Sequence, residues 1–231
     1  MPNWCYNTTL VHGPQEERKR FLEVIEEQGQ YHITNVVPMP EALEGTESPS
    51  PSSPEPHPNW IKMLEAGEMS QSWYDELCSN QIKRYEAGVR AKAATGYRDW
   101  YEWANAIWGT KWGDCETSVE SDEDSLRLTY NTAWGPFDPS FWEKVSTAFP
   151  LLSFINFGTE ESNAFVYCYA FINGYEVFNI EDDVNCFTEI EDDEERWDKT
   201  SDWEAEWIDA RSAEAFDAVS KYGELARTDR G

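Results

Sequence analysis

The chain has 231 residues, of which 40% are hydrophobic and 15% aromatic, and its formal net charge is −27. This composition excludes a disordered protein, and the length allows one large domain or a small domain with insertions. The charge disfavours direct binding to nucleic acid or to an anionic membrane surface and favours rapid capture of a basic partner. Residues 1–110 carry 9 basic and 16 acidic side chains, a net −7, which leaves −20 for residues 111–231.

The cysteines and the absence of targeting signals indicate the cellular compartment. Five cysteines form no C-x-x-C pair, and an odd number argues against a closed disulfide framework. The sequence has no signal-peptide pattern and no apolar run of about 18 residues. We therefore expect a cytoplasmic protein in a reducing environment, with no membrane span.

The N-terminal segment predicts a strand, a helix and a short extended run. Asn3 to Val11 alternates in the way of a half-buried strand. Gly13-Pro14 then opens a helix with acidic residues in its first turn, which we expect to end at Gly29. The side chains expected to face a sheet are Phe21, Val24 and Ile25. Tyr31 to Val37 is expected to be extended, because prolines follow it directly.

The next segment, at about residues 41–112, is predicted to be a helical insertion. Thr46 to Pro58 is rich in proline and serine, which is typical of a mobile, solvated loop with polyproline character. A proline-rich motif that a partner binds is the alternative. From Trp60 to Trp112 the apolar residues follow a helical period, and Gly88 is expected to interrupt the first long helix.

Tyr97 to Trp112 contains four tryptophans and is the most aromatic part of the chain. Large apolar residues at i, i+3, i+4, i+7 and i+8 predict a core helix that ends at Gly109. A platform that stacks on a base or a sugar is the alternative. Trp112 lies beyond the helix end and is therefore the tryptophan of this run most compatible with a pocket.

Strand signals return after Asp114. Cys115 to Glu120 and Leu126 to Ala133 predict a hairpin, and Asp138-Pro139 predicts the capped start of a helix that ends at Pro150. The last expected strands are Leu151–Phe157, Ala164–Ile172 and Tyr175–Ile180, the final two joined by the hairpin dipeptide Asn173-Gly174. Without the insertion the order is β-α-β-β-α-β, which predicts an α+β, ferredoxin-like domain at 1–180. An acidic, helical extension at 181–231 follows it.

Four short segments resemble a known family. They are Met1-Pro2-Asn3-Trp4-Cys5 with Asn7, Val37-Pro38-Met39-Pro40, Trp108-Gly109-Thr110-Lys111-Trp112, and Thr132-Ala133-Trp134-Gly135-Pro136. Together they are similar to the YubB-type ferredoxin-like family of bacteriophages and plasmids, over roughly residues 1–175. The resemblance implies a ferredoxin-like fold and a mobile-element origin. It implies no catalytic residues, because the function of that family is not established.

Tryptophan and asparagine recur in these segments and allow two interpretations. Buried indole N–H groups need acceptors, which asparagine amides or nearby carbonyls can supply, so a structural role is the first interpretation. The second is a pocket for a small molecule or nucleotide, lined by Trp4, Asn7, Trp112 and Trp134.

Sequence patterns for catalysis and metal binding are absent. The three histidines are isolated from one another and from the cysteines, and no zinc-ligand spacing occurs. The acidic runs lack the alternation and the glycine of a calcium loop. The sequence also lacks a glycine-rich phosphate loop, a G-x-S-x-G elbow and an H-E-x-x-H motif. We therefore expect no enzyme activity, no metal and no cofactor.

The acidic C-terminal segment is the most informative feature for function. Glu181 to Asp209 contains 14 Asp or Glu and only two basic residues, interleaved with large apolar side chains. The apolar residues predict an ordered surface, with Asp202 capping a final helix on which Trp203 and Trp207 pair. The residues expected to contact a partner are Glu181, Asp182, Asp183, Glu189, Glu191, Asp192, Asp193, Glu194, Glu195, Asp198 and Asp202.

Ordered carboxylates can imitate the phosphates of DNA, and they also keep an aromatic-rich protein soluble. With the mobile-element resemblance, the first hypothesis is a non-enzymatic accessory protein that binds and inhibits a basic host protein. A nuclease or another defence factor fits that description, with the bacterial host cytoplasm as the location. A sensor domain that binds a small molecule in the tryptophan-lined pocket is the alternative.

Overall fold

The computed structural model describes residues 3–162, 164–184 and 190–228, excluding the side chains of 193 and 224–228. The chain forms two compact units. The first combines Met1–Pro38 with Ile107–Gly231, and the second is Met39–Ala106.

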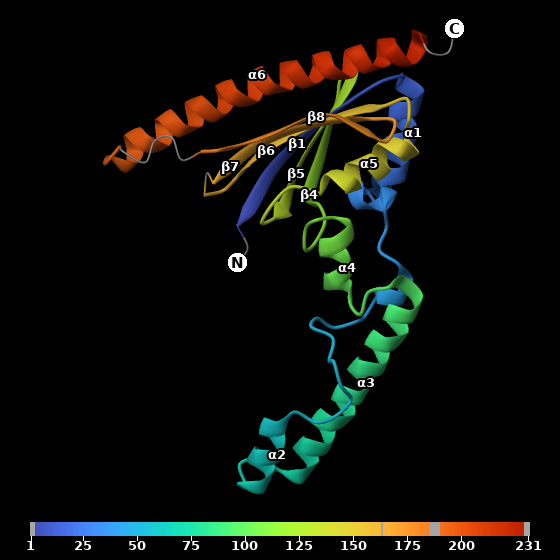
Figure 1. Ribbon diagram of the computed structural model, residues 1–231, viewed down its shortest axis with the longest axis vertical. Helices are drawn as coiled ribbons and strands as arrows, with labels where there is room; N and C mark the ends of the chain where they lie inside the picture. The colour runs from blue at the N-terminus through green and yellow to red at the C-terminus, as the bar shows by residue number, and fades with distance from the viewer. Residues whose placement is uncertain (1–2, 163, 185–189, 229–231) are drawn as a thin grey trace. The chain divides into compact units, whose positions relative to one another are not determined.

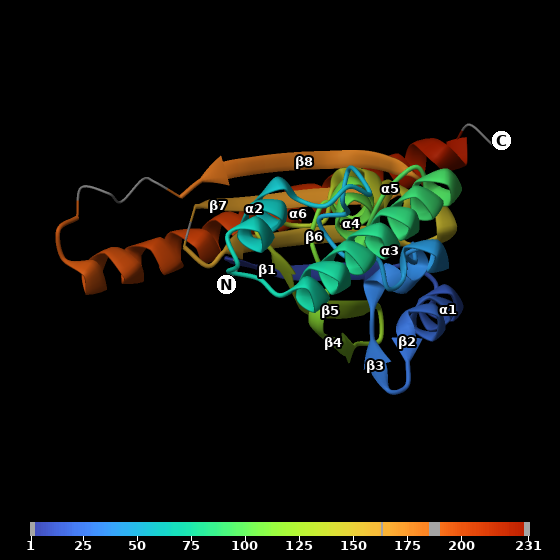
Figure 2. The ribbon, with the colours of Figure 1, turned by 90° about the horizontal axis from the view of Figure 1, so that it is seen from below.

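The first unit is built on a six-stranded antiparallel sheet (Figure 2). Its strands are β1 (Trp4–His12), β4 (Cys115–Ser121), β5 (Ser125–Ala133), β6 (Ser153–Glu160), β7 (Phe165–Ile172) and β8 (Tyr175–Asp183). Their spatial order is β4-β5-β1-β6-β7-β8, and all neighbouring strands are antiparallel. The four strands β4-β5-β1-β6 have the spatial order of a ferredoxin-like sheet, with β1 in the interior. This order confirms the predicted α+β, ferredoxin-like fold.

The predicted terminal hairpin extends this sheet. β7 and β8 add to the β6 edge and are joined at Asn173-Gly174, as the sequence predicts. Both residues have positive φ, 51° and 81°, which a two-residue turn of this kind requires. Asparagine and glycine adopt this backbone region at low cost, so the dipeptide fixes the register of the two strands.

Helices cover both faces of the sheet (Figure 1). α1 (Gln15–Ile25) and α5 (Pro139–Ala148) lie on one face, and α6 (Asp193–Thr228) lies on the other. Asp138 caps α5 by accepting from Ser140 N at 2.8 Å, as predicted. Buried aromatic residues fill the first layer, including Phe21, Phe141, Trp142 and Phe154, and several of their rings meet edge to face.

Two expectations for α1 are wrong. The helix ends at Ile25 rather than Gly29, because the chain turns through a two-stranded hairpin of β2 (Glu26–Glu27) and β3 (Gln30–Tyr31). Val24 is 40% exposed and does not face the sheet. Arg18 is buried instead, since its guanidinium donates to the carbonyl oxygens of Gly13, Asp122 and Glu123. The sequence does not show that backbone carbonyls meet there.

The segment Tyr31–Val37 is not extended, as the sequence suggested, but forms the 3₁₀ helix η1 (Ile33–Val36). The buried carboxylate of Asp114 accepts hydrogen bonds from Ile33 N at 2.9 Å and from Thr34 N and Oγ1 at 3.0 Å each. A long-range acceptor therefore satisfies the N–H groups at the start of this turn.

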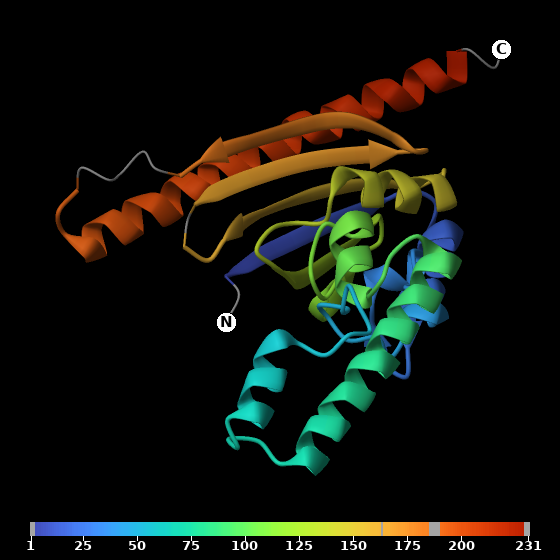
Figure 3. The ribbon, with the colours of Figure 1, turned by 60° about the horizontal axis from the view of Figure 1, so that its bottom comes forward.

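The second unit contains η2 (Glu41–Leu43), α2 (Pro58–Glu65), α3 (Gln71–Thr95) and most of α4 (Trp100–Ile107). α2 and α3 form a helical hairpin (Figure 3). Gly88 does not interrupt α3, contrary to expectation. It is buried against Ser50, whose Oγ would lie 2.0 Å from a Cβ added at this position. The glycine thus allows a close approach of two segments rather than a break in the helix.

The proline-rich loop is irregular, as predicted, but it is held in place by α3. Arg84 donates to the carbonyl of Pro49 at 2.9 Å and pairs with Glu47 at the same distance. Gln81 donates to the carbonyl of Ser53 at 3.0 Å. These contacts hold the loop to α3, while most of its residues are exposed, as the composition predicts.

The tryptophan-rich helix is a packing helix, as the spacing predicts. Trp103 and Ala104 are buried, and the helix ends at Ile107. Gly109 follows with φ 78°, and an added Cβ would lie 2.6 Å from Asp138 N.

Gly158 offers a test of the sheet register. A Cβ added there would lie 2.1 Å from the carbonyl oxygen of Tyr6 on the neighbouring strand, and backbone cannot move aside cheaply. We expect Gly158→Ala to lower the free energy of unfolding by about 1–3 kcal/mol or more, as measured by urea denaturation. Gly135→Ala is the matched control, because an added Cβ has open space there. Equal stability of the two variants would contradict this packing.

His12 offers a test of the contact between β1 and α6. Its ring packs edge to face on that of Phe216, and the two ring centres are 5.3 Å apart. Burial first, and the charge of Arg18 second, lower the pKa of His12 below its usual value of 6.5, while Asp124 opposes them. The unfolded chain therefore binds more protons in this window, and stability should fall as the pH drops below about 6.5. His12→Gln should lose less stability over the same pH range in thermal unfolding. Superimposable pH profiles would contradict the assignment.

Candidate functional site

α6 starts earlier in the chain than the sequence suggested. It begins at Asp193, so Asp202 lies inside the helix and does not cap it. The cap is Asp192, whose Oδ1 accepts from Glu195 N at 2.9 Å. Acidic residues in the first turn favour this start, and Glu195 pairs with Lys199 one turn later at 2.7 Å.

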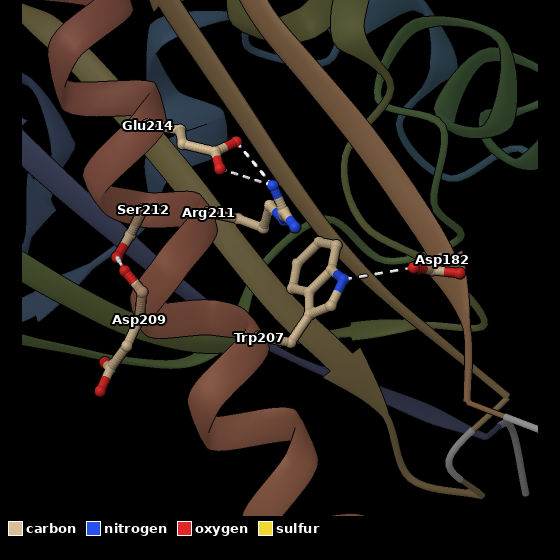
Figure 4. Close-up of polar contacts among 6 residues, drawn as sticks. All are labelled: Asp182, Trp207, Asp209, Arg211, Ser212 and Glu214. Atoms are coloured by element: carbon tan, nitrogen blue, oxygen red, sulfur yellow. Dashed lines mark hydrogen bonds and ion pairs between the residues drawn. The ribbon is translucent and has the colours of Figure 1, made fainter. Parts of the chain in front are cut away.

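One face of α6 is apolar and packs mainly on β6, β7 and β8 (Figures 1 and 2). Trp207, Ala215 and Val219 are buried there, and Trp203 and Ile208 pack beside them, as the predicted stripe requires. The indole Nε1 of Trp207 donates to Asp182 Oδ2 on β8 at 3.3 Å (Figure 4). This hydrogen bond ties the helix to the edge strand of the sheet.

The opposite face of α6 carries a row of carboxylates, called here the acidic row: Glu195, Asp198, Asp202, Glu206 and Asp209. All five residues are exposed, and they follow one another at spacings of three or four residues. Such spacing places them along one side of the helix. Figure 4 shows Asp209 on the side of the helix away from Trp207. With a rise of about 1.5 Å per residue, the row spans about 21 Å.

The predicted contact residues divide into two groups. Four have partners within the chain: Asp182 accepts from Trp207, Asp192 caps α6, Glu181 accepts from the hydroxyl of Tyr169 at 3.0 Å, and Glu195 pairs with Lys199. The others are Asp183, Glu191, Glu194, Asp198 and Asp202, and all nine of these residues are exposed. Glu189 lies outside the described residues, as does the side chain of Asp193.

Sequence reasoning omitted two members of the acidic row, Glu206 and Asp209, from its contact residues. Extending the spacing of three or four residues beyond Asp202 would have found both. That extension requires the helix to be recognised as continuous from Asp193.

A second candidate surface, called here the aromatic cluster, consists of Trp4, Lys111, Trp112 and Trp134. The ring centres of Trp4 and Trp112 are 6.0 Å apart. Nζ of Lys111 lies 4.4 Å from the ring centre of Trp112 and 5.5 Å from that of Trp134. Trp112 is 41% exposed and Trp134 is 48% exposed. The tryptophans that the sequence singled out for a pocket therefore gather at the surface, with an ammonium group near two of them.

The backbone around Trp134 is unusual. Trp134 has φ 67°, a region that bulky residues rarely adopt and that costs of order 1–2 kcal/mol. Its N–H donates to the carbonyl of Asn3 at 2.8 Å. The preceding residue, Ala133, bonds to the hydroxyl of Thr110 through both its N–H and its carbonyl group, at 3.0 and 3.1 Å. Several hydrogen bonds thus hold the strained residue in place.

The four segments that carry the family resemblance meet at this end of the sheet. Trp108 Nε1 donates to the carbonyl of Val37 at 2.9 Å, which joins the second and third segments. The Thr110–Ala133 bonds join the third to the fourth, and the Trp134–Asn3 bond joins the fourth to the first. The structure therefore brings together residues that are far apart in sequence.

Asn7 does not face the aromatic cluster. It is buried on the other face of β1, where its amide donates to the carbonyl of Cys5 at 2.8 Å and to Thr132 Oγ1 at 2.9 Å. Its Oδ1 accepts from the hydroxyl of Tyr167 at 2.7 Å. This network supports the structural interpretation of Asn7, because each buried polar atom of the amide has a partner.

A groove of about 330 Å³ adjoins α6 on the same sheet face as Trp4. The residues that line it include Tyr6, Thr8, Asn131, Phe157, Thr159 and Ile208. At its edge, Glu204 of α6 accepts from Thr159 Oγ1 at 3.0 Å. Burial raises the pKa of Glu204, and the hydrogen bond from Thr159 opposes this shift. Sequence reasoning did not identify Tyr6 or Glu204, since neither belongs to a local motif.

Burial affects the thiols of three of the cysteines. Burial raises the pKa of Cys5 and of Cys168 to about 12 each, which disfavours the reactive thiolate form. Burial also raises the pKa of Cys115. Within the described ranges, no three His, Cys, Asp or Glu side chains are grouped to hold a metal ion. No helix among them is both long and apolar enough to cross a membrane.

Comparisons with known proteins give one remote structural match. No protein-family model matches the chain, and no curated protein matches it. Among solved structures, it is similar to the protein api92 from Yersinia pseudotuberculosis, described with the family model DUF1281. The TM-score is 0.47 at 10% sequence identity, covering 79% of this chain and 98% of that chain. Similarity at this level identifies neither a family nor a function.

The thiol assignments can be tested by alkylation. In the native protein at about pH 8, iodoacetamide should leave Cys5 and Cys168 unmodified, because thiols with raised pKa values are poor nucleophiles. Both should react after denaturation, as mass spectrometry of peptides would show. Rapid native labelling of Cys5 would contradict its assignment as a structural thiol and would make cysteine catalysis a serious alternative.

Proposed function

We propose that this protein is a non-enzymatic binding protein that captures a basic partner protein through the acidic row of α6. The observation that carries the proposal is the arrangement of five exposed carboxylates along one side of a helix whose other side is anchored in the sheet. A fixed row loses little side-chain and backbone freedom on binding compared with a disordered acidic tail. The row is therefore a preorganised surface for lysine and arginine side chains.

The charge of the whole chain supports the same partner chemistry. A net charge of −27 creates a field that attracts cationic surfaces and repels nucleic acid. The acidic row carries about one charge per 5 Å of helix axis, whereas duplex DNA carries about one per 1.7 Å. The row is thus a sparser line of charge than a duplex, and capture also depends on the surrounding acidic side chains.

The resemblance to a phage and plasmid family suggests the identity of the partner. The partner in this proposal is a basic, nucleic-acid-binding protein of the bacterial host, such as a nuclease or another defence factor. Its Lys/Arg groove would accept carboxylates in place of phosphates, and this occupation would inhibit it. The protein would act in the host cytoplasm, where such a factor meets mobile DNA.

A sensor domain that binds a small molecule is the second candidate function. The aromatic cluster favours it, since Trp112 and Trp134 are 41% and 48% exposed and Trp4 lies two residues from Tyr6, which lines the groove. A thermal-shift screen with small molecules separates the two functions. A small ligand that binds the protein raises its melting temperature by mass action, whereas capture of a partner protein at the surface requires no small ligand.

The acidic row can be tested by neutralising it. The row variant combines Asp198→Asn, Asp202→Asn, Glu206→Gln and Asp209→Asn, which changes the net charge by four, from −27 to −23. The control variant makes the same change elsewhere, with Glu23→Gln, Glu27→Gln, Glu44→Gln and Glu65→Gln, all at exposed positions. Both should fold with wild-type stability, because surface substitutions rarely shift it by more than about 0.5 kcal/mol.

The readout is a pull-down from bacterial lysate, followed by competition between this protein and DNA for the captured partner. The row variant should bind the partner about tenfold or more weakly, while the control variant stays near wild type. Wild-type binding should weaken as salt rises from about 50 to about 200 mM. Capture that is independent of salt, or unchanged in the row variant, would refute electrostatic mimicry.

A further inference from the structure

Within the described residues of the first unit, α6 covers mainly one side of the sheet face on which it packs. α6 packs mainly on β6, β7 and β8, and the outward faces of β1, β5 and β4 lie beside it. Side chains two apart on a strand share a face, so Trp4 and Tyr6 point to this side while Cys5 points to the core. Tyr6 is 49% exposed, and the aromatic cluster adjoins it at the Trp4 end. The exposed ring of Tyr6 therefore lines the groove, and Trp4 of the aromatic cluster follows on the same side of β1, two residues away.

The position of Lys111 shows what chemistry this cluster accepts. Its ammonium lies within about 6 Å of two indole ring centres, which is the range of an attractive cation–π contact. Trp134, which carries one of these indoles, has a strained positive φ and is 48% exposed. The cluster is thus shaped to hold a positive group against indole faces, and the chain's own lysine occupies that position.

Two carboxylates accept hydrogen bonds from side chains that line the same groove. Glu204 lies at its α6 edge, bonded to Thr159, and Glu116 Oε2 accepts from Asn131 Nδ2 at 3.0 Å. Glu204 is partly desolvated, so a neighbouring cation would stabilise its charged form. The net charge of −27 and both carboxylates repel ligands that carry phosphate groups.

These observations favour an arginine over other occupants. A guanidinium is planar and weakly hydrated, stacks on indole faces and can pair with a carboxylate at the same time. An ammonium is more strongly hydrated and gains less from stacking.

We propose that the aromatic cluster and the adjoining groove bind an arginine side chain of a basic polypeptide, which displaces the ammonium of Lys111 from the indoles. This inference rests on the proposed function and adds to it a specific contact. The acidic row attracts the partner, and the aromatic cluster selects arginine from among its basic residues.

The test measures binding of two defined probes, octa-arginine and octa-lysine, to the full chain by fluorescence anisotropy at fixed salt. The wild type should bind octa-arginine more tightly. Trp112→Ala should weaken octa-arginine binding by about 2- to 30-fold and remove the preference for octa-arginine over octa-lysine. The affinity of Trp112→Phe should lie between those of the wild type and Trp112→Ala. Trp197→Ala is the matched control, because Trp197 is a 58% exposed tryptophan on α6 outside the cluster.

The direction of the change in octa-arginine affinity in the Lys111→Ala variant distinguishes a cation site from an anion site. Vacating the position should strengthen octa-arginine binding by about fivefold. Lys19→Ala, at an exposed helix position, controls for the loss of one positive charge and should have a smaller effect. Weaker binding of octa-arginine by the Lys111→Ala variant would overturn the proposal.

The outcomes distinguish this inference from the proposed function. If the row variant loses octa-arginine binding while the Trp112 and Trp197 variants behave alike, the arginine site is refuted and the acidic row stands. If the Trp112 variants lose the arginine preference while the row variant binds both peptides as wild type does, the arginine site stands and capture by the row is refuted. Thermal unfolding of each variant confirms that it is folded.

Discussion

The docking of α6 on the sheet is the contact that orients the acidic row and forms one side of the groove. Residues on one side of the helix complete a second apolar layer with β6, β7 and β8. Since a helix presents its side chains around a full turn, burying this side fixes the rotation of α6 about its axis. The acidic residues then face solvent in a set direction, and the inner edge of the helix becomes one wall of the groove. Apolar packing thus determines where the charge is placed.

The ferredoxin-like core also explains why the aromatic cluster exists at all. β1 lies between β5 and β6, so its N-terminal end is next to the C-terminal end of β5 and to the segment that returns from the insertion. Thr110 and Trp134 belong to connections at that end, where the backbone is free to leave regular sheet geometry. Functional residues often collect on such connections, because the strands below supply rigidity.

The features that were predictable from sequence are those encoded locally. The Asn173-Gly174 turn, the Asp138 cap and the alternation in β1 and β5 each depend on a few neighbouring residues, and all three are present. Long-range contacts decide the features that were not predicted. The carboxylate of Asp114 converts residues 33–36 into a 3₁₀ turn from a position about 80 residues away. The buried guanidinium of Arg18 is the same kind of case.

The candidate sites follow the same division. The tryptophans of the cluster were recognisable as large residues outside regular helix or strand positions, but their meeting with Lys111 depends on tertiary structure. The acidic segment was evident from composition, yet the helix start decided which carboxylates form one row. Asn7 is the opposite case. It is close to Trp4 in sequence, but its side chain points to the other face of β1 and so does not belong to the cluster.

The hydrogen bond between Trp108 Nε1 and the carbonyl of Val37 has a consequence for the insertion. It joins the two points where the chain leaves the core unit and returns to it, on either side of Met39–Ala106. Once those points are held together, the entropy of closing the loop between them depends only weakly on its length, by about 0.6 kcal/mol for each doubling. Lengthening or shortening the insertion should therefore change this closing entropy little.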